Sequence, residues 1–265
     1  MGSRKDCVQS SSPPSVWDSV VCGVDLSPAS VHAALESARL MPPAARLTLC
    51  SVVSPEAIAD EPSLERTLTH DAEAALERAQ AEIQPFHDAE LHLREGPPIA
   101  RLLDEVRAEH ATLVAVGSHG HSHAAGLALG RVATAMLHEA SCSVLIVDAS
   151  PPSDGEVVVG FDGSGGARRA LAAGRELSER LMLKLRAIVA TGDAHPLEPG
   201  WLDDELAPEL ALIEDPRTAV DALEDASRSA RLLVVGSRHL QGVMALSSVS
   251  ERAARRAGCP VLVVR

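Results

Sequence analysis

The chain has 265 residues, a formal net charge of −13, and only 2% aromatic residues with no tyrosine. Such an acidic balance disfavours broad attraction to nucleic acid or to an anionic membrane surface, and the scarcity of aromatic rings removes the usual stacking platforms for single strands. No apolar run is long enough to cross a bilayer, and the N-terminal residues lack the features of a secretory signal. We therefore expect a cytoplasmic protein with no nucleic-acid or membrane partner.

The sequence contains one domain twice. Residues 20–27 (VVCGVDLS) return as residues 157–164 (VVVGFDGS), and residues 113–118 (LVAVGS) return as residues 232–237 (LLVVGS). A repeat of more than 100 residues indicates two whole domains, because solenoid units are much shorter.

In chain order, a Pro/Ser-rich stretch predicts a disordered tail at 1–17, followed by a first domain at 18–149. Apolar runs predict strands that alternate with amphipathic helices. The expected strands are 20–24, 46–53, 90–95, 113–116 and 143–147, and the expected helices include 33–40, 62–83, 99–109 and 131–138. Continuous apolar strands between helices are typical of a doubly wound α/β domain whose parallel sheet is covered on both faces.

A Ser/Pro/Gly-containing linker is predicted at 150–155, and the second domain occupies 156–265. The second domain is a shorter copy, in which residues 192–205 contain Pro and Gly and are expected to form a loop with at most a short helix. The fold class is therefore two tandem doubly wound parallel-sheet domains.

Five cysteines, an odd number, lie partly within the predicted strands. We expect buried thiols rather than a disulfide framework, and the alternative is a redox role for the equivalent pair Cys142 and Cys259.

A glycine motif follows the fourth strand. Gly117 and Gly120 are separated by two residues, and Gly130 opens the next helix nine residues later. In an open parallel sheet, ligands bind beyond the carboxyl ends of the strands, where Asp25 also lies. Glycine allows close backbone approach, and a helix N-terminus attracts phosphate.

With Asp25, this glycine spacing, and the closing run Cys142–Val147, the chain resembles the universal stress protein family over both halves. The resemblance implies a Rossmann-like fold and binding of ATP or a related adenine nucleotide, with or without Mg²⁺. By position it implies that Asp25 faces the ribose and that Val52 offers its backbone to adenine. It also implies that the ribose and phosphates are surrounded by Val116, Gly117, Gly120, Gly130 and Val132.

Some positions depart from the family pattern. Arg131 stands where the family has a phosphate-binding hydroxyl, so a long cation could either pair with phosphate or obstruct it. In the second half His239 and Ser247 replace glycines, and the loop is two residues shorter. These changes predict a degenerate second site, with nucleotide binding confined to domain 1.

Plainer interpretations stay open. Asp25 and Asp162 could cap the turns that follow them, and the glycines could serve chain reversal alone. The histidines His119, His121 and His123 could bind a metal, add positive charge beside phosphate, or simply be solvated; we expect no metal site. The sequence contains no Walker lysine and no paired carboxylates for hydrolysis. We therefore predict no catalytic residues, and ATPase activity would be slow at most.

By resemblance, the function is a regulatory role in stress, starvation or dormancy. Members of the family dimerise through their last strand, and here residues 143–147 and 260–264 could make that contact within one chain and cover both edges. A homo-oligomer or an unknown protein partner stays open. The main alternative is a nucleotide-free protein-interaction module of the same fold.

Overall fold

The computed structural model describes residues 17–54, 62–120, 129–149, 154–192, 211–237 and 249–265. The first half contains β1 (Ser19–Gly23), α1 (Pro28–Leu40), β2 (Arg46–Val53), α2 (Pro62–Ile83), β3 (Glu90–Glu95), α3 (Pro98–Ala108), β4 (Leu113–Gly117), α4 (Arg131–Glu139) and β5 (Ser143–Val147). The second half contains β6 (Glu156–Gly160), α5 (Gly165–Leu181), β7 (Leu185–Ala190), β8 (Ala211–Asp215), α7 (Ala219–Ser227), β9 (Ala230–Gly236), α8 (Val249–Arg256) and β10 (Val261–Val264).

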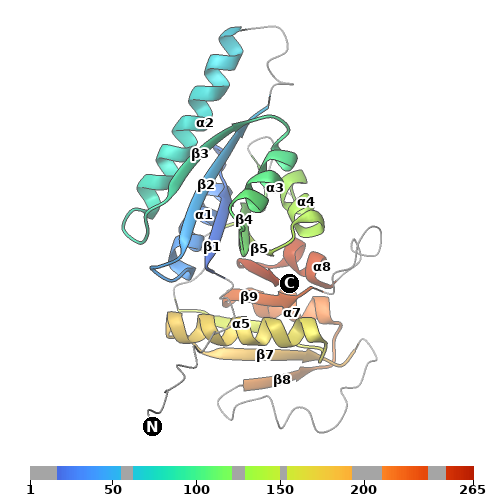
Figure 1. Ribbon diagram of the computed structural model, residues 1–265. Helices are drawn as coiled ribbons and strands as arrows, with labels where there is room; N and C mark the ends of the chain where they lie inside the picture. Colours follow the sequence, from blue (N-terminus) through green and yellow to red (C-terminus); the bar gives the residue numbers. More distant parts are fainter. Residues whose placement is uncertain (1–16, 55–61, 121–128, 150–153, 193–210, 238–248) are drawn as a thin grey trace, which may run out of the picture.

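All of these strands join one sheet in the order β3-β2-β1-β4-β5-β10-β9-β6-β7-β8. Pairing within each half is parallel, with β1 between β2 and β4, and β6 between β7 and β9. Figure 1 shows the sheet running through the molecule from the blue and green strands of the first half to the red and orange strands of the second. The predicted α/β class with parallel strands and covering helices is confirmed.

The two halves meet at a single antiparallel pair. In that pair β10 lies beside β5, with Val261 opposite Ile146 and Val263 opposite Val144. The predicted contact between the two last strands within one chain is thus confirmed. Because each strand hydrogen-bonds to the other, neither has an open edge at the seam.

Helices cover both faces of the sheet and bury a core on each. One core lies between the sheet and α1, α2 and α5, and the other lies between the sheet and α3, α4, α7 and α8. Both cores contain residues of both halves, so apolar packing continues across the seam.

Charged groups also join the halves. Glu36 on α1 is fully buried and lies 2.5 Å from the guanidinium of Arg231, at the start of β9. His138 on α4 pairs with buried Glu251 on α8 at 3.3 Å, and Arg265 donates to the carbonyl oxygen of Leu137. Buried charges require such partners, because an unpaired charge away from water is costly.

The predicted end of the tail lies at a buried residue. Trp17, the last residue of the predicted tail, is fully buried in the core beneath α1, α2 and α5. A large aromatic side chain gains more from burial than the neighbouring polar sequence suggests. Residues 1–16, the linker positions 150–153 and most of the predicted loop at 192–205 lie outside the described residues.

Among the residues that the structure describes, no helix is both long and apolar enough to span a membrane.

Candidate nucleotide site

The first half contains a cavity of about 610 Å³ at the carboxyl ends of its strands. The ends of β1, β2 and β4 and the first turns of α3 and α4 form its walls. All eight residues that the sequence selected line this one cavity: Asp25, Val52, Val116, Gly117, Gly120, Gly130, Arg131 and Val132. The predicted elements therefore bring together a set of residues spread over more than 100 positions of sequence.

Asp25 holds the loop after β1 in place and also faces the cavity. Its Oδ1 accepts a hydrogen bond from the backbone N–H of Ser27 at 2.9 Å and another from the Ser27 hydroxyl. Ser27 in turn caps α1 by accepting from the N–H of Ser30 at 3.2 Å. The turn-capping role left open by the sequence is therefore present, and it fixes the carboxylate at the cavity wall.

The glycines of the motif are required because neighbouring atoms pack closely against their Cα atoms, and not because their backbone angles are unusual. None of Gly117, Gly120 and Gly130 has a positive φ. A Cβ on Gly117 would lie 2.8 Å from the backbone nitrogen of Ser30, whereas a Cβ on Gly120 would lie 3.1 Å from Oδ2 of Asp25. Gly117 is thus needed for packing of β4 against α1, and Gly120 leaves room beside the Asp25 carboxylate.

The N-terminus of α4 opens into the cavity. Gly130 is its N-cap and supplies no side-chain hydrogen bond to the first turn, and the next three residues, Arg131, Val132 and Ala133, line the cavity. The N–H of Gly130 donates to the carbonyl of Ser118 at 2.8 Å, which closes the glycine loop onto the helix start. The N–H groups of a helix's first turn and the helix dipole favour an anion at this position, and Arg131 adds a formal positive charge.

A polar group lies at the ends of β4 and β5, and His119 is the member of it that lines the cavity. The Ser118 hydroxyl bonds to the carboxylate of Asp148, and Nδ1 of His119 lies 2.8 Å from the Ser118 oxygen and 3.3 Å from Asp148. Gly117 pairs with Val147, so the residues that follow them are neighbours. Of the predicted histidine cluster, His119 lines the cavity, while His121 and His123 lie outside the described residues.

The opposite wall is apolar. Ile99 and Leu102 of α3 line the cavity together with Val52, and none of the α3 residues was selected from sequence. Cys50 also lines this wall, where burial, reinforced by the nearby Glu105 charge, raises the pKa of its thiol to about 12. The thiol stays protonated at neutral pH, so Cys50 acts as a small apolar group rather than a nucleophile. An apolar slot beside an anion-binding helix end suits a flat ring that carries phosphate.

Fold and cavity together define a two-part α/β protein of the Rossmann-like class, with a ligand-sized cavity beyond the carboxyl ends of the strands in its first half. The family profile described as "Universal stress protein family" matches residues 17–148 and 173–265. The chain belongs to the universal stress protein family.

Relatives agree with that assignment. A universal stress protein of Mycolicibacterium smegmatis is 32% identical over 195 residues, which cover 63% of this chain and 66% of that protein. One from Mycobacterium tuberculosis is 30% identical over 212 residues, covering 65% of this chain and 71% of its own length. The chain thus spans about two thirds of the length of these curated relatives.

Among solved structures, a universal stress protein from Archaeoglobus fulgidus superposes with a TM-score of 0.77 at 21% identity, covering 94% of this chain and 96% of that one. At this identity the likeness establishes the shared fold over nearly the whole chain.

Proposed function

We propose that this protein is a cytoplasmic stress-response regulator that binds ATP or a related adenine nucleotide in a first domain at 18–149. The observation that carries the proposal is the convergence of the eight selected residues on one cavity, with a helix N-terminus at one end and an apolar slot at the other. Its volume of about 610 Å³ lies within the usual range of about 300–1,000 Å³ for small-molecule sites.

Each part of the nucleotide has a matching part of the cavity. The phosphates would lie at the start of α4, near the N–H groups after Gly130 and the Arg131 guanidinium. The ribose hydroxyls would meet Asp25, and adenine would fit between Val52 and the α3 residues. A bound Mg²⁺ would balance phosphate charge without requiring a dedicated protein cage.

The second domain, at 156–265 after a linker at 150–155, acts in this proposal as a structural partner. Gly236, the counterpart of Gly117, packs so closely against α5 that a Cβ would lie 2.2 Å from Gly166. Tight packing accounts for this glycine without any ligand. The altered loop at 238–248 lies outside the described residues, and its degeneracy stays a prediction.

The test is to denature the purified protein, identify any released nucleotide by chromatography and mass, and titrate nucleotide-free protein with ATP by calorimetry. We expect one site per chain. Gly120→Ala should weaken binding about tenfold, because the added methyl displaces the Asp25 carboxylate. Gly165→Ala is the matched control, since the nearest atom of the described residues to a Cβ at that helical position lies 3.7 Å away.

Two other functions predict different results. A protein that arrives empty and also fails to bind added ATP would be a nucleotide-free interaction module. Steady phosphate release that is lost in Asp25→Asn would indicate an ATPase; we expect none above a slow background, because the sequence has no Walker lysine and no paired carboxylates beside the glycine loop.

A further inference from the structure

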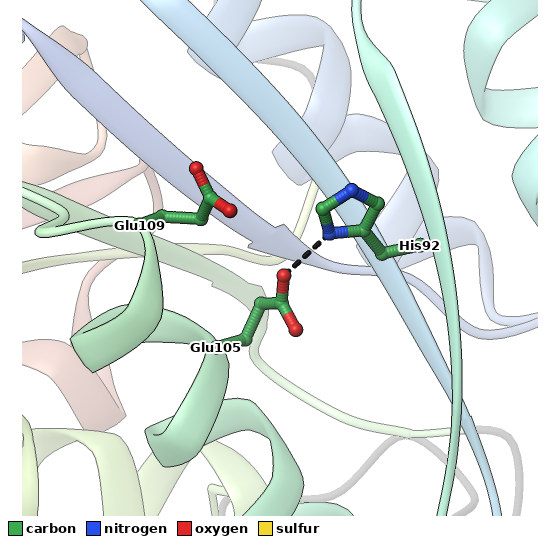
Figure 2. Close-up of side chains that lie close together, drawn as sticks. All are labelled: His92, Glu105 and Glu109. Carbon is green, nitrogen blue, oxygen red and sulfur yellow. Dashed lines mark hydrogen bonds and ion pairs between the residues drawn. The ribbon is translucent and has the colours of Figure 1, made fainter.

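A second cluster of ligand-type side chains lies beyond the cavity, between β3 and α3. His92, Glu105 and Glu109 each offer one nitrogen or oxygen atom, and these atoms all lie within 4.8 Å of one another. Figure 2 shows the two carboxylates and the imidazole turned toward the same space, with His92 Nδ1 2.5 Å from Oε1 of Glu105. Nothing in the proposed nucleotide site uses this group.

The secondary structure explains the convergence. Residues two apart on a strand share a face, so His92 and Arg94 both point toward α3. Residues four apart on a helix also share a face, so Glu105 and Glu109 both point back at the strand. Glu105 is only 3% exposed, whereas His92 and Glu109 are open to water at 22% and 21%.

The charges around the cluster favour a cation. Three carboxylates face two guanidinium groups there, which leaves one net negative charge when the imidazole is neutral. The contacts are Arg94 Nε to Glu105 Oε2 at 2.7 Å, Arg94 NH2 to Glu105 Oε1 at 3.2 Å and to His92 Nδ1 at 3.1 Å, Arg46 to Glu109 at 3.6 Å, and His92 Nε2 to Glu90 at 3.7 Å.

We propose that His92 Nδ1 and one carboxylate oxygen each of Glu105 and Glu109 bind a divalent transition metal of the Zn²⁺ type, with water as the fourth ligand. An imidazole with two carboxylates suits such ions better than Mg²⁺ or Ca²⁺, which take oxygen ligands. The imidazole coordinates as the neutral base, and any proton on Nδ1 passes to solvent.

Small side-chain movements produce the required geometry. Zinc–ligand bonds of about 2.0–2.2 Å place tetrahedral donors roughly 3.4 Å apart. The 2.5 Å contact between His92 and Glu105 must open by about 1 Å, and the widest pair must close by up to about 1.4 Å. Rotation of the Arg94 head, whose side chain is 41% exposed, removes NH2 from Oε1 while Nε stays on Oε2 and orients the carboxylate.

The metal would join the edge strand β3 to the helix that forms the apolar wall of the cavity. It would therefore stabilise the first half whether or not a nucleotide binds there.

The experiment titrates metal-free full-length protein with Zn²⁺ by calorimetry and with Co²⁺ by visible absorption. The tested variants are His92→Gln and Glu109→Gln, at partly exposed positions whose exchange leaves the buried Glu105–Arg94 pair intact. Asp104→Asn is the matched control, since this exposed carboxylate of the same helix pairs with Arg101 and Arg107 outside the cluster.

We expect one equivalent of Zn²⁺ and a tetrahedral Co²⁺ band in wild type and Asp104→Asn, and an affinity about 100-fold lower in both His92→Gln and Glu109→Gln. Equal binding by wild type and His92→Gln would assign the metal to other histidines and overturn the proposal. Loss in only one of the two variants would overturn the three-ligand site, and no binding by wild type would leave the cluster as an ion-pair network.

Discussion

Replacing Gly117 by alanine should destabilise the fold independently of any ligand. The new Cβ would lie 2.8 Å from the nitrogen of Ser30, 2.9 Å from the carbonyl carbon of Ala29 and 3.0 Å from the Ala29 Cβ. Two of these neighbours are backbone atoms of α1, so no side-chain rotation relieves the contact. Overpacking of this kind costs typically about 1–3 kcal/mol, and the backbone contacts put Gly117→Ala near 2–3 kcal/mol.

The assay is urea and thermal unfolding, followed by circular dichroism. At about 2–4 °C per kcal/mol for a chain of this size, the midpoint of Gly117→Ala should fall by roughly 4–12 °C. Gly120→Ala serves as the comparison, because within the described part of the chain its Cβ would closely approach a side-chain atom, Oδ2 of Asp25 at 3.1 Å, and no backbone atom, so it should cost less than about 1 kcal/mol. If Gly117→Ala is as stable as wild type, or Gly120→Ala is the less stable of the two, the packing role of Gly117 is refuted.

Three further changes test the core and the seam. Glu36→Gln should lower the free energy of unfolding by about 3–5 kcal/mol in urea titrations, because it leaves the Arg231 guanidinium buried without its ionic partner; a change below 1 kcal/mol would mean that water compensates. Trp17→Ala should cost about 3–5 kcal/mol by the same assay, and an unchanged midpoint would place Trp17 outside the core. In the Cys7→Ser variant, the native protein should not react rapidly with a thiol reagent at pH 8, because burial raises the pKa of every cysteine that the structure describes. After denaturation the reagent should label four thiols per chain, and rapid labelling of the native protein would contradict the prediction. Those cysteines are Cys22, Cys50, Cys142 and Cys259.

Most of the fold could be predicted from the sequence, because strands that are buried on both faces appear in the sequence as continuous apolar runs. Three of the five first-half strands have the predicted bounds, β4 is one residue longer than predicted, and β1 is shifted by one residue. Ion pairs between residues far apart in the sequence could not be predicted in this way. Glu36 and Arg231 each belong to a residue type expected at the surface, and only the packing of α1 against the second half buries them together.

For the cavity, the sequence identified the loops that follow strands. These loops lie together because parallel strands place their carboxyl ends at the same edge of the sheet. The sequence did not reveal the contact of Asp148 with Ser118 next to the cavity, although the parallel pairing of β4 with β5 makes these residues neighbours. It also missed Ile99 and Leu102, because a helix residue that lines a ligand slot has the same apolar character as one that packs in a core. The positions of His92, Glu105 and Glu109 in the sequence do not follow a recognisable metal-binding motif. These side chains meet only because α3 packs over β3 in one particular register.

The antiparallel pair of β5 and β10 also sets the order in which the protein can be completed during synthesis. β5 ends at Val147, but its partner begins only at Val261, so the ribosome must add more than 100 further residues before the pair can form. At about 5–20 residues per second, β5 is without its partner strand for several seconds or longer. During that interval nascent chains on one messenger could pair with each other through β5, and the arrival of the last strand ends that competition.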